Sequence, residues 1–265
     1  MPHIGNWADL SAPEFAALDR AGAVAVLPIG AIEQHGAHLA MSVDRDLTLA
    51  VLDRAMTLLP GHLTMLALPV QAIGKSTEHQ TWPGTLTLSA QTLLAVLHDI
   101  AASVARAGVK RLIFVNGHGG NRALLELACR DLRADLGLIT AHVAWDDLAD
   151  ADSVVGEAEA RDGLHGGDVE TSAMLAAHPG KVRMDLAEDY GSAHIAWRDH
   201  HPLLGLGSAP TRPGWLMGDL NPKGAIGNAA AATTAKGEVL LANAARNLAR
   251  VLTDFAHFGQ ADQPG

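Results

Sequence analysis

Three segments of the chain combine histidines with carboxylates at spacings that suit metal binding. The first covers residues 30–38, Gly-Ala-Ile-Glu-Gln-His-Gly-Ala-His, in which Glu33 and His35 are two residues apart. In an extended backbone, side chains two residues apart point the same way. Asp44 follows nine residues after His35 and could return to the same place. Its two oxygens could then bridge two ions.

The other two segments have a similar composition. Asn-Gly-His-Gly-Gly-Asn covers residues 116–121 and contains His118, while His-Gly-Gly-Asp-Val-Glu covers residues 165–170 and contains Asp168 and Glu170. A mixed set of histidines and carboxylates suits Zn²⁺, Mn²⁺ or Fe²⁺ better than Mg²⁺ or Ca²⁺. Two such ions, about 3.5–4 Å apart, would lower the pKa of a shared water from about 16 towards about 7. The bridging hydroxide would then be available at neutral pH.

Each segment taken alone also fits a purely structural role. A Glu-x-His pair after a strand is common in solvated turns. The glycines of residues 116–121 could supply the positive φ of a flexible turn. The acid at the third segment could favour a helix N-terminus. Spacing by itself leaves both interpretations open.

The secondary structure predicted around these segments places them at the ends of strands or the starts of helices. Alternating strands and helices favour a mostly parallel sheet covered by helices on both faces. In such folds, ligands bind beyond the carboxyl ends of the strands. We expect strands at residues 23–29, 62–69, 110–115 and 138–144, and helices at residues 44–58, 89–107, 121–136, 170–177 and 228–255.

The chain shows neither an internal repeat nor a domain linker. We therefore expect one domain over residues 1–258 and a frayed tail over residues 259–265. Residues 149–167 are acidic and contain glycine, which predicts a loop or lid, and residues 187–227 are predicted to be irregular.

Composition excludes several classes of protein. A formal net charge of −10 with no Lys/Arg-rich run argues against nucleic-acid binding. No apolar stretch reaches the ~18 residues of a membrane span. The first residues lack the features of a signal peptide, so we expect a cytoplasmic protein. The single cysteine, Cys129, lies in a helical pattern, and no Gly-x-Ser-x-Gly motif is present, so a cysteine or serine hydrolase is disfavoured.

In these motifs the sequence resembles the creatininase, or creatinine amidohydrolase, family. The matching segments are residues 27–39, 76–86, 115–121 and 165–172. The resemblance implies a metal-dependent hydrolase with a single-domain, three-layer α/β/α fold and a mostly parallel sheet. It also implies a homo-oligomer, with a hexamer favoured, that acts on a small-molecule substrate.

The resemblance further implies a pair of divalent ions, Zn²⁺, Mn²⁺ or Fe²⁺. Glu33, Asp44 and His118 would hold one ion, and His35 with the bridging Asp44 would hold the other. In creatininase itself, a further acid lies two residues beyond the histidine of the Asn-Gly-His motif. Here that position is Gly120, which cannot bind a metal.

We expect Asp168 to replace that acid as the fifth ligand, with Glu170 as its rival. Two residues apart at the start of a helix, they point to different sides, so only one should touch the metals. Glu170 is then expected to orient a ligand or to cap backbone N–H groups.

Other residues are assigned to the substrate side of the site by the same resemblance. His165 would lie over the substrate, where it could stabilise the oxyanion or protonate the leaving nitrogen. Trp145 would form a wall of the pocket, although core packing is equally compatible with its position. His38 is placed beside the pocket, behind the metal ligands. Glu78 and His79 lie in a matching segment but receive no role.

The predicted function is hydrolysis of a C–N bond, in a cyclic amide or a formamide, by the metal-bridging hydroxide. A lactonase that opens a small cyclic ester and a peptidase-like member are alternatives. A third alternative is a catalytically inactive relative that binds a ligand or acts as a scaffold for an assembly. Creatinine is not assumed as substrate, because Gly120 replaces an acid of creatininase.

Overall fold

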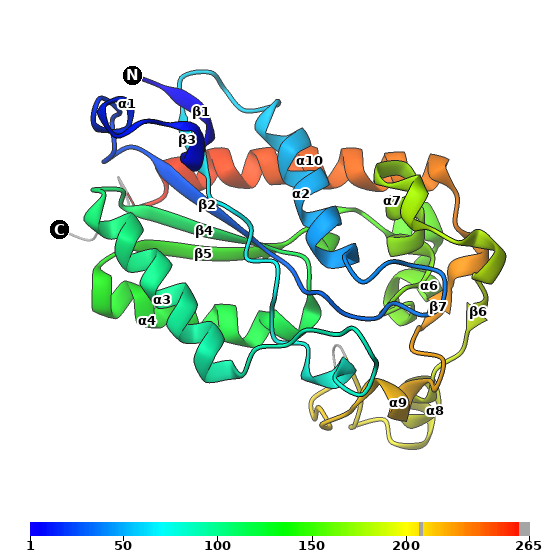
Figure 1. Ribbon diagram of the computed structural model, residues 1–265. Coiled ribbons are helices and arrows are strands. Elements are labelled where there is room, and N and C mark those ends of the chain that lie inside the picture. Colours follow the sequence, from blue (N-terminus) through cyan, green and yellow to red (C-terminus); the bar gives the residue numbers. More distant parts are fainter. Residues whose placement is uncertain (207–208, 260–265) are drawn as a thin grey trace.

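A computed structural model describes residues 1–206 and 209–259 (Figure 1). Its main sheet has five strands, all parallel, in the order β1-β3-β2-β4-β5. The strands are β1 (His3–Asn6), β2 (Val24–Ile29), β3 (Thr64–Ala67), β4 (Arg111–Asn116) and β5 (Ile139–Ala144). The edge strand β1 was not predicted, because its four residues contain no apolar run.

Helices cover both faces of the sheet. The bounds are α1 (Ala12–Ala16), α2 (Val43–Met56), α3 (Ala90–Arg106), α4 (Arg122–Leu136), α7 (Asp168–Ala177) and α10 (Thr234–His257). Figure 1 shows α2, α7 and α10 on one side and α3 and α4 on the other. In β2, Val24 and Val26 belong to the core beneath α2 and α10, whereas Ala25 and Leu27 belong to the core beneath α3 and α4. The predicted three-layer α/β/α fold is confirmed.

Local sequence explains where the helices begin and end. Ser89 caps α3 by accepting a hydrogen bond from the backbone N–H of Thr92. Leu93 and Leu97, four residues apart, are buried on the face that packs on the sheet. Just beyond the helix, Gly108 has a φ of 88°, which favours glycine.

Two segments contain more structure than the sequence predicted. The predicted loop or lid at residues 149–167 contains α5 (Asp152–Val155) and α6 (Glu157–Asp162), which are too short to show a helical period. The region predicted as irregular contains α8 (Ala193–His200), α9 (Met217–Leu220) and the antiparallel pair β6 (Asp189–Tyr190) and β7 (Gly227–Asn228).

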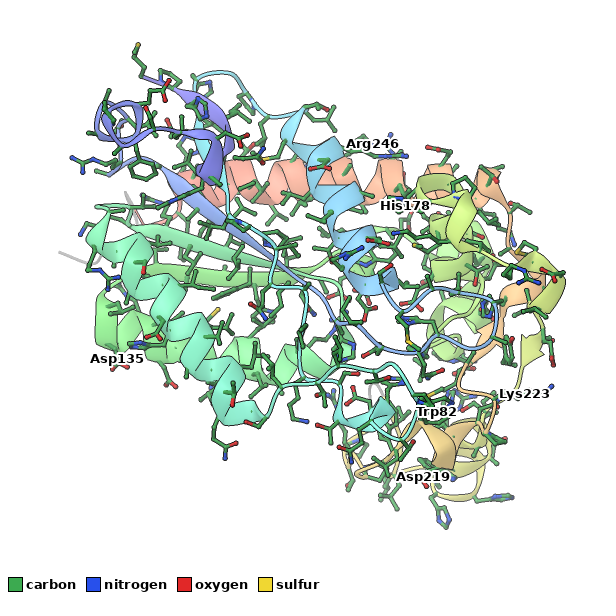
Figure 2. The ribbon with its side chains drawn as sticks, viewed as in Figure 1. Trp82, Asp135, His178, Asp219, Lys223 and Arg246 are labelled. Atoms are coloured by element: carbon green, nitrogen blue, oxygen red, sulfur yellow. The ribbon has the colours of Figure 1, made fainter. Side chains whose placement is uncertain are left out.

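A small apolar cluster joins α9 to a distant part of the chain. Trp82 packs with Met217 and Leu220. Figure 2 labels Trp82 and, in the same region of the molecule, Asp219 of α9. Apart from Gly259, the tail predicted at residues 259–265 lies outside the described residues. Within the described part of the chain, no helix has the length and apolarity to cross a membrane.

The packing of α7 on α10 depends on one glycine. A methyl group at the buried Gly237 of α10 would overlap the backbone carbonyl of Ser172 in α7. The two helices are therefore in backbone contact at this point. Since α7 begins with Asp168 and Glu170, this contact sets where those acids lie.

We expect Gly237→Ala to lower the free energy of unfolding by about 1–3 kcal/mol, the usual effect of overpacking a core. Helix propensity alone would have the opposite sign, because alanine is favoured over glycine by up to about 1 kcal/mol. Urea titration measures the difference. Gly180→Ala is the control, since a methyl group there meets no atom of residues 1–206 or 209–259 within 4 Å. An alanine at 237 that leaves stability unchanged would contradict the proposed helix contact.

Candidate metal centre

The four residues predicted as core ligands come together at the carboxyl edge of the sheet. Glu33 and His35 follow the end of β2, Asp44 is the second residue of α2, and His118 follows β4. One ligand atom from each of Glu33, His35 and Asp44 lies within 4.8 Å of the others. His118 Nδ1 is 3.3 Å from Glu33 Oε1 and 3.5 Å from Asp44 Oδ2.

A glycine allows the loop after β4 to reach the start of α2. A methyl group at Gly117 would overlap the Thr48 hydroxyl and the backbone of Asp44. The Asn-Gly-His motif therefore packs directly against the first turn of the helix that carries Asp44. This close approach gives Gly117 a steric role beside the chemical role of His118.

Asp44 faces a different histidine with each carboxylate oxygen. Oδ1 is 3.2 Å from His35 Nε2, and Oδ2 is 3.5 Å from His118 Nδ1. Asp44 and Glu33 are buried, and neither Asp44 Oδ2 nor Glu33 Oε1 accepts a hydrogen bond from the described residues. Burying an unpaired carboxylate oxygen is unfavourable. These orphaned oxygens therefore fit a bound cation.

The two histidines present acceptor nitrogens to these carboxylates. His35 Nδ1 is 3.1 Å from the carbonyl of Glu33, and His118 Nε2 is 3.0 Å from the carbonyl of Lys75. A carbonyl only accepts, so these nitrogens carry the hydrogens. The opposite nitrogens, His35 Nε2 and His118 Nδ1, then direct lone pairs at carboxylates unless a proton or a metal lies between them. This orientation is the usual one for metal-binding imidazoles.

When no metal is bound, protonated histidines supply the positive charge next to these carboxylates. Burial lowers the pKa of His35, but the nearby carboxylates together outweigh burial and raise this pKa to about 10. Asp44 contributes most of the rise, followed by Glu170 and Glu33. Burial also opposes the charge on His118, yet Glu33 raises its pKa well above the ordinary value. For Glu33, burial raises the pKa but the surrounding histidines, His118 first, lower it overall. Burial and the charge of Glu33 raise the pKa of Asp44.

The structure distinguishes between the two acids at the start of α7. One oxygen of Asp168 accepts a hydrogen bond from Ser172 (2.7 Å), and the other pairs with Lys236. Glu170 Oε2 instead lies 3.9 Å from His35 Nε2, and Glu170 groups with His35 and His165. This arrangement corrects the sequence-based prediction, which places Asp168 at the cluster. The two acids do point to different sides, but Glu170 is the one that faces the histidines.

Glu170 is held by the loop that precedes it. Its Oε2 accepts a hydrogen bond from the backbone N–H of Gly166 (2.6 Å). Burial raises the pKa of Glu170 to about 7, although the nearby His35 acts in the opposite direction. Glu170 also lines a cavity of about 450 Å³ whose other acidic residues are Asp146, Asp147, Asp150 and Asp152.

Two residues that we expect to line the substrate pocket, Trp145 and His38, are instead buried away from the cluster. Trp145 is 1% exposed and belongs to the hydrophobic core with Val43 and Leu47, which is the core-packing alternative. His38 is equally buried, and its Nε2 lies 3.0 Å from both the Gly166 carbonyl and the Thr171 hydroxyl. His38 therefore supports the loop around His165 instead of facing the cluster.

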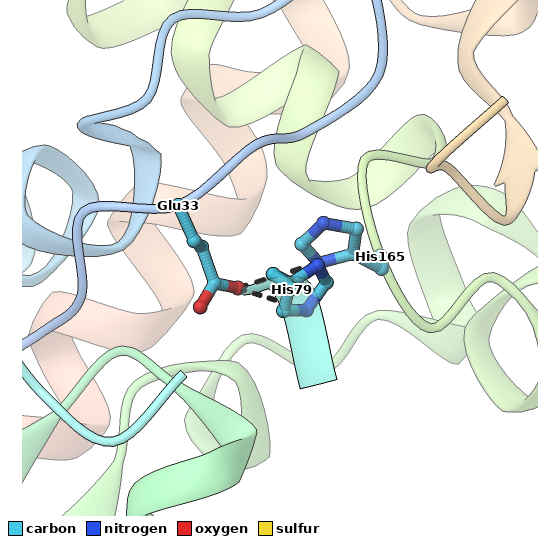
Figure 3. Close-up of side chains that lie close together, drawn as sticks. All are labelled: Glu33, His79 and His165. Atoms are coloured by element: carbon cyan, nitrogen blue, oxygen red, sulfur yellow. Dashed lines mark ion pairs between the residues drawn. The ribbon is translucent and has the colours of Figure 1, made fainter. Parts of the chain in front are cut away.

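His165 lies inside the cluster, with a histidine on each side. Its ring stacks on His35, with centroids 4.1 Å apart, and is tilted against the ring of His79, with centroids 4.3 Å apart. Its Nδ1 is 3.7 Å from Glu33 Oε1, and His79 Nε2 is 3.3 Å from the same oxygen (Figure 3). Burial, followed by the charges of His35 and His79, lowers the pKa of His165 well below its ordinary value. Burial likewise lowers the pKa of His79, to about 4.

The short helical turn η2 (Thr77–His79) and the serine before it supply groups that the sequence left without a role. Ser76 donates a hydrogen bond to Glu33 Oε2, and Glu78 Oε1 is 3.3 Å from His118 Nε2. A methyl group at Gly120 would overlap both Glu78 and His118. The space in front of Gly120 is thus filled by an acid from another loop. The only signal for this turn was its presence in the family-like segment 76–86.

Comparison with known proteins places this geometry in a family. The chain matches the creatininase family, described as creatinine amidohydrolase, over residues 8–252. A mycofactocin precursor peptide peptidase from Mycobacterium ulcerans is 33% identical over 82% of this chain and 79% of its own. The creatinine amidohydrolase of Pseudomonas putida is 31% identical over 88% and 90% of the two chains.

Solved structures of creatininase have the same fold. A creatininase variant complexed with creatine is 27% identical, with a TM-score of 0.76 over 97% of this chain and 99% of that one. A Zn-Zn type variant gives 26% identity and a TM-score of 0.76 over 96% and 98%. Creatininase with Mn is 26% identical, with a TM-score of 0.75 over 95% of this chain and 98% of that one. The chain therefore belongs to the creatininase family of metal-dependent hydrolases.

Proposed function

We propose that this protein is an amidohydrolase that cleaves the C–N bond of a cyclic amide or a formamide in a small polar molecule. The observation that carries the proposal is the convergence of two orphaned carboxylate oxygens, on Glu33 and Asp44, with two imidazole lone pairs. Divalent ions, when bound, lower the pKa of water and so supply hydroxide at neutral pH. Zn²⁺, Mn²⁺ and Fe²⁺ all suit these ligand types.

We assign five side chains to two ions. Glu33, Asp44 and His118 would hold one ion, and His35, Asp44 and Glu170 the other. Glu170 replaces Asp168 in this assignment, because both oxygens of Asp168 already have partners. The cavity beside Glu170, at about 450 Å³, lies in the size range of small-ligand sites.

A peptidase is the second candidate. The observation in its favour is the 33% identity to a mycofactocin precursor peptide peptidase, since a peptide bond is also an amide. A lactonase would use the same hydroxide but needs no proton on a leaving nitrogen. An inactive scaffold would bind without turnover.

A hydrolysis screen of metal-reconstituted protein on cyclic amides, formamides, short peptides and lactones tests the function. We expect amide turnover that a chelator abolishes. Glu33→Gln should lose one ion and most of the turnover, as measured by metal analysis and initial rates. Glu126→Gln is the matched control, because that side chain is 61% exposed on α4. Turnover of lactones alone would refute the bond assignment, and a Glu33→Gln enzyme with full metal and activity would refute the site.

The assignment of Glu170 as a ligand has its own isosteric test. Glu170→Gln should weaken the binding of one of the two ions, because it removes a charge that faces His35. Asp168→Asn should retain both ions but lower the melting temperature, because it removes the charge that pairs with Lys236. Metal content after dialysis and thermal melting measure the two effects. The opposite pattern would restore Asp168 as the ligand.

Metal binding should release protons at pH 7. His35 has a pKa of about 10 in the metal-free protein, so its imidazole must lose a proton before Nε2 can bind an ion. This pKa is raised above the ordinary value of about 6.5. The contribution of the protonated His35 to the free energy of unfolding is therefore complete below about pH 6.5 and is lost as the pH rises through about 10.

Calorimetric zinc titrations in two buffers with different ionisation enthalpies measure this proton release. We expect different apparent heats in the two buffers. The melting temperature of the metal-free protein should fall between pH 6.5 and 10, and the metal-loaded protein should not share this fall. Equal heats in both buffers would contradict a protonated His35.

Family resemblance also leads us to propose a cytoplasmic homo-oligomer, with a hexamer favoured. Light scattering of the purified protein would give its mass and decide the assembly.

A further inference from the structure

The Gln34 side chain, between Glu33 and His35, has a fully determined orientation. Its Oε1 accepts a hydrogen bond from the backbone N–H of Gly36 (2.9 Å), so the opposite end of the amide is the NH₂ group. One hydrogen of that group goes to the carbonyl of Gly224 (2.8 Å) and the other to His79 Nδ1 (2.8 Å). A backbone N–H only donates and a carbonyl only accepts, so the amide cannot be reversed.

This orientation fixes the tautomer of His79. Since Nδ1 accepts a hydrogen bond, the ring is neutral and carries its single hydrogen on Nε2. Nε2 lies 3.3 Å from Glu33 Oε1, yet that oxygen accepts no hydrogen bond from any residue that the structure describes. Among residues 1–206 and 209–259, Nε2 has no other acceptor. The N–H group of His79 therefore faces the cluster as a donor, and a nitrogen that carries a hydrogen cannot bind a metal.

Gln34 fixes the tautomer of His165 as well, through its backbone. His165 Nε2 is 2.7 Å from the Gln34 carbonyl, so Nε2 donates and Nδ1 keeps its lone pair. That lone pair is on the side of Glu33 Oε1, 3.7 Å away. Both rings thus carry their hydrogen on Nε2. In His79 this nitrogen is the one near Glu33, whereas in His165 the nitrogen near Glu33 is Nδ1 (Figure 3).

We propose that His79 is a catalytic residue, whose Nε2–H donates a hydrogen bond to the substrate oxygen that becomes negatively charged as the carbonyl carbon is attacked. A fixed N–H donor at a developing oxyanion stabilises the transition state without transferring a proton. His165 is the acceptor of the pair, which differs from the donor role that we expected for it. Gln34 is the positioning residue for both rings. The proposal rests on the proposed function, since it needs a carbonyl substrate.

The tautomers can be measured without a substrate. Nitrogen-15 spectra of the zinc-loaded protein, with histidines labelled, should show His79 protonated on Nε2 and bare on Nδ1, its signals assigned by their loss in His79→Gln. Gln34→Glu replaces the donor with a carboxylate acceptor, so the hydrogen of His79 should move to Nδ1. A hydrogen on Nδ1 in the unsubstituted protein, or a zinc-bound Nε2, would overturn the proposal. A failed substrate screen would sink the proposed function but leave this measurement intact.

Kinetics then separate a donor from a structural residue. His79→Ala and Gln34→Glu should each lower kcat by about 10²–10³, the usual effect of removing an oxyanion donor, with zinc content unchanged. His79→Gln should recover part of the loss, since its amide can donate.

Gln80→Glu is the control, because it makes the same change of charge next to His79 on an exposed side chain. We expect its kcat to match that of the unsubstituted protein. If Gln34→Glu does not fold, the two His79 variants decide. Zinc loss in parallel with activity in His79→Ala, or an unchanged kcat there, would refute the donor role.

Discussion

Glu33 and Asp44 are buried side by side, and each has one carboxylate oxygen that accepts no hydrogen bond from residues 1–206 or 209–259. Two negative charges out of water need compensating positive charge, because the desolvation penalty is several kcal/mol per ion. Without a metal, His35 and His118 satisfy this need by holding protons. Divalent ions would satisfy it with the same ligand atoms. The affinity for metal thus follows from a charge imbalance built into the fold.

Backbone carbonyls determine which ring nitrogen of each histidine faces the cluster. Three histidines each donate a hydrogen bond from one ring nitrogen to a backbone carbonyl, that of Glu33, Lys75 or Gln34. The other ring nitrogen of each histidine then faces the cluster. Asn121 ties two of the loops together, since it donates to the Gly30 carbonyl and accepts from the Lys75 N–H. Ligand geometry is therefore set by loops whose own positions are fixed by hydrogen bonds. This is the pre-organisation that metal sites and active sites require.

The orientation of α7 about its own axis determines which of its acidic side chains faces the site. The contact of α10 with α7 at Gly237 holds α7 so that Glu170 faces His35 while Asp168 turns to Lys236. His38 supports the segment just before α7 through the Gly166 carbonyl. A backbone contact between two helices thus helps to set which acid faces the histidines.

The sequence alone determined the alternation of strands and helices, the layered fold, and the four residues that meet at the edge of the sheet. Those features follow from local patterns: buried apolar runs such as β2, helix caps such as Ser89, and motifs that directly follow strands. The choice of Glu170 over Asp168 and the burial of Trp145 in the core were decided by the tertiary structure. So was the entry of Glu78 and His79 into the site. Each depends on how an element is rotated or which distant loop lies beside it, and no local pattern encodes those contacts.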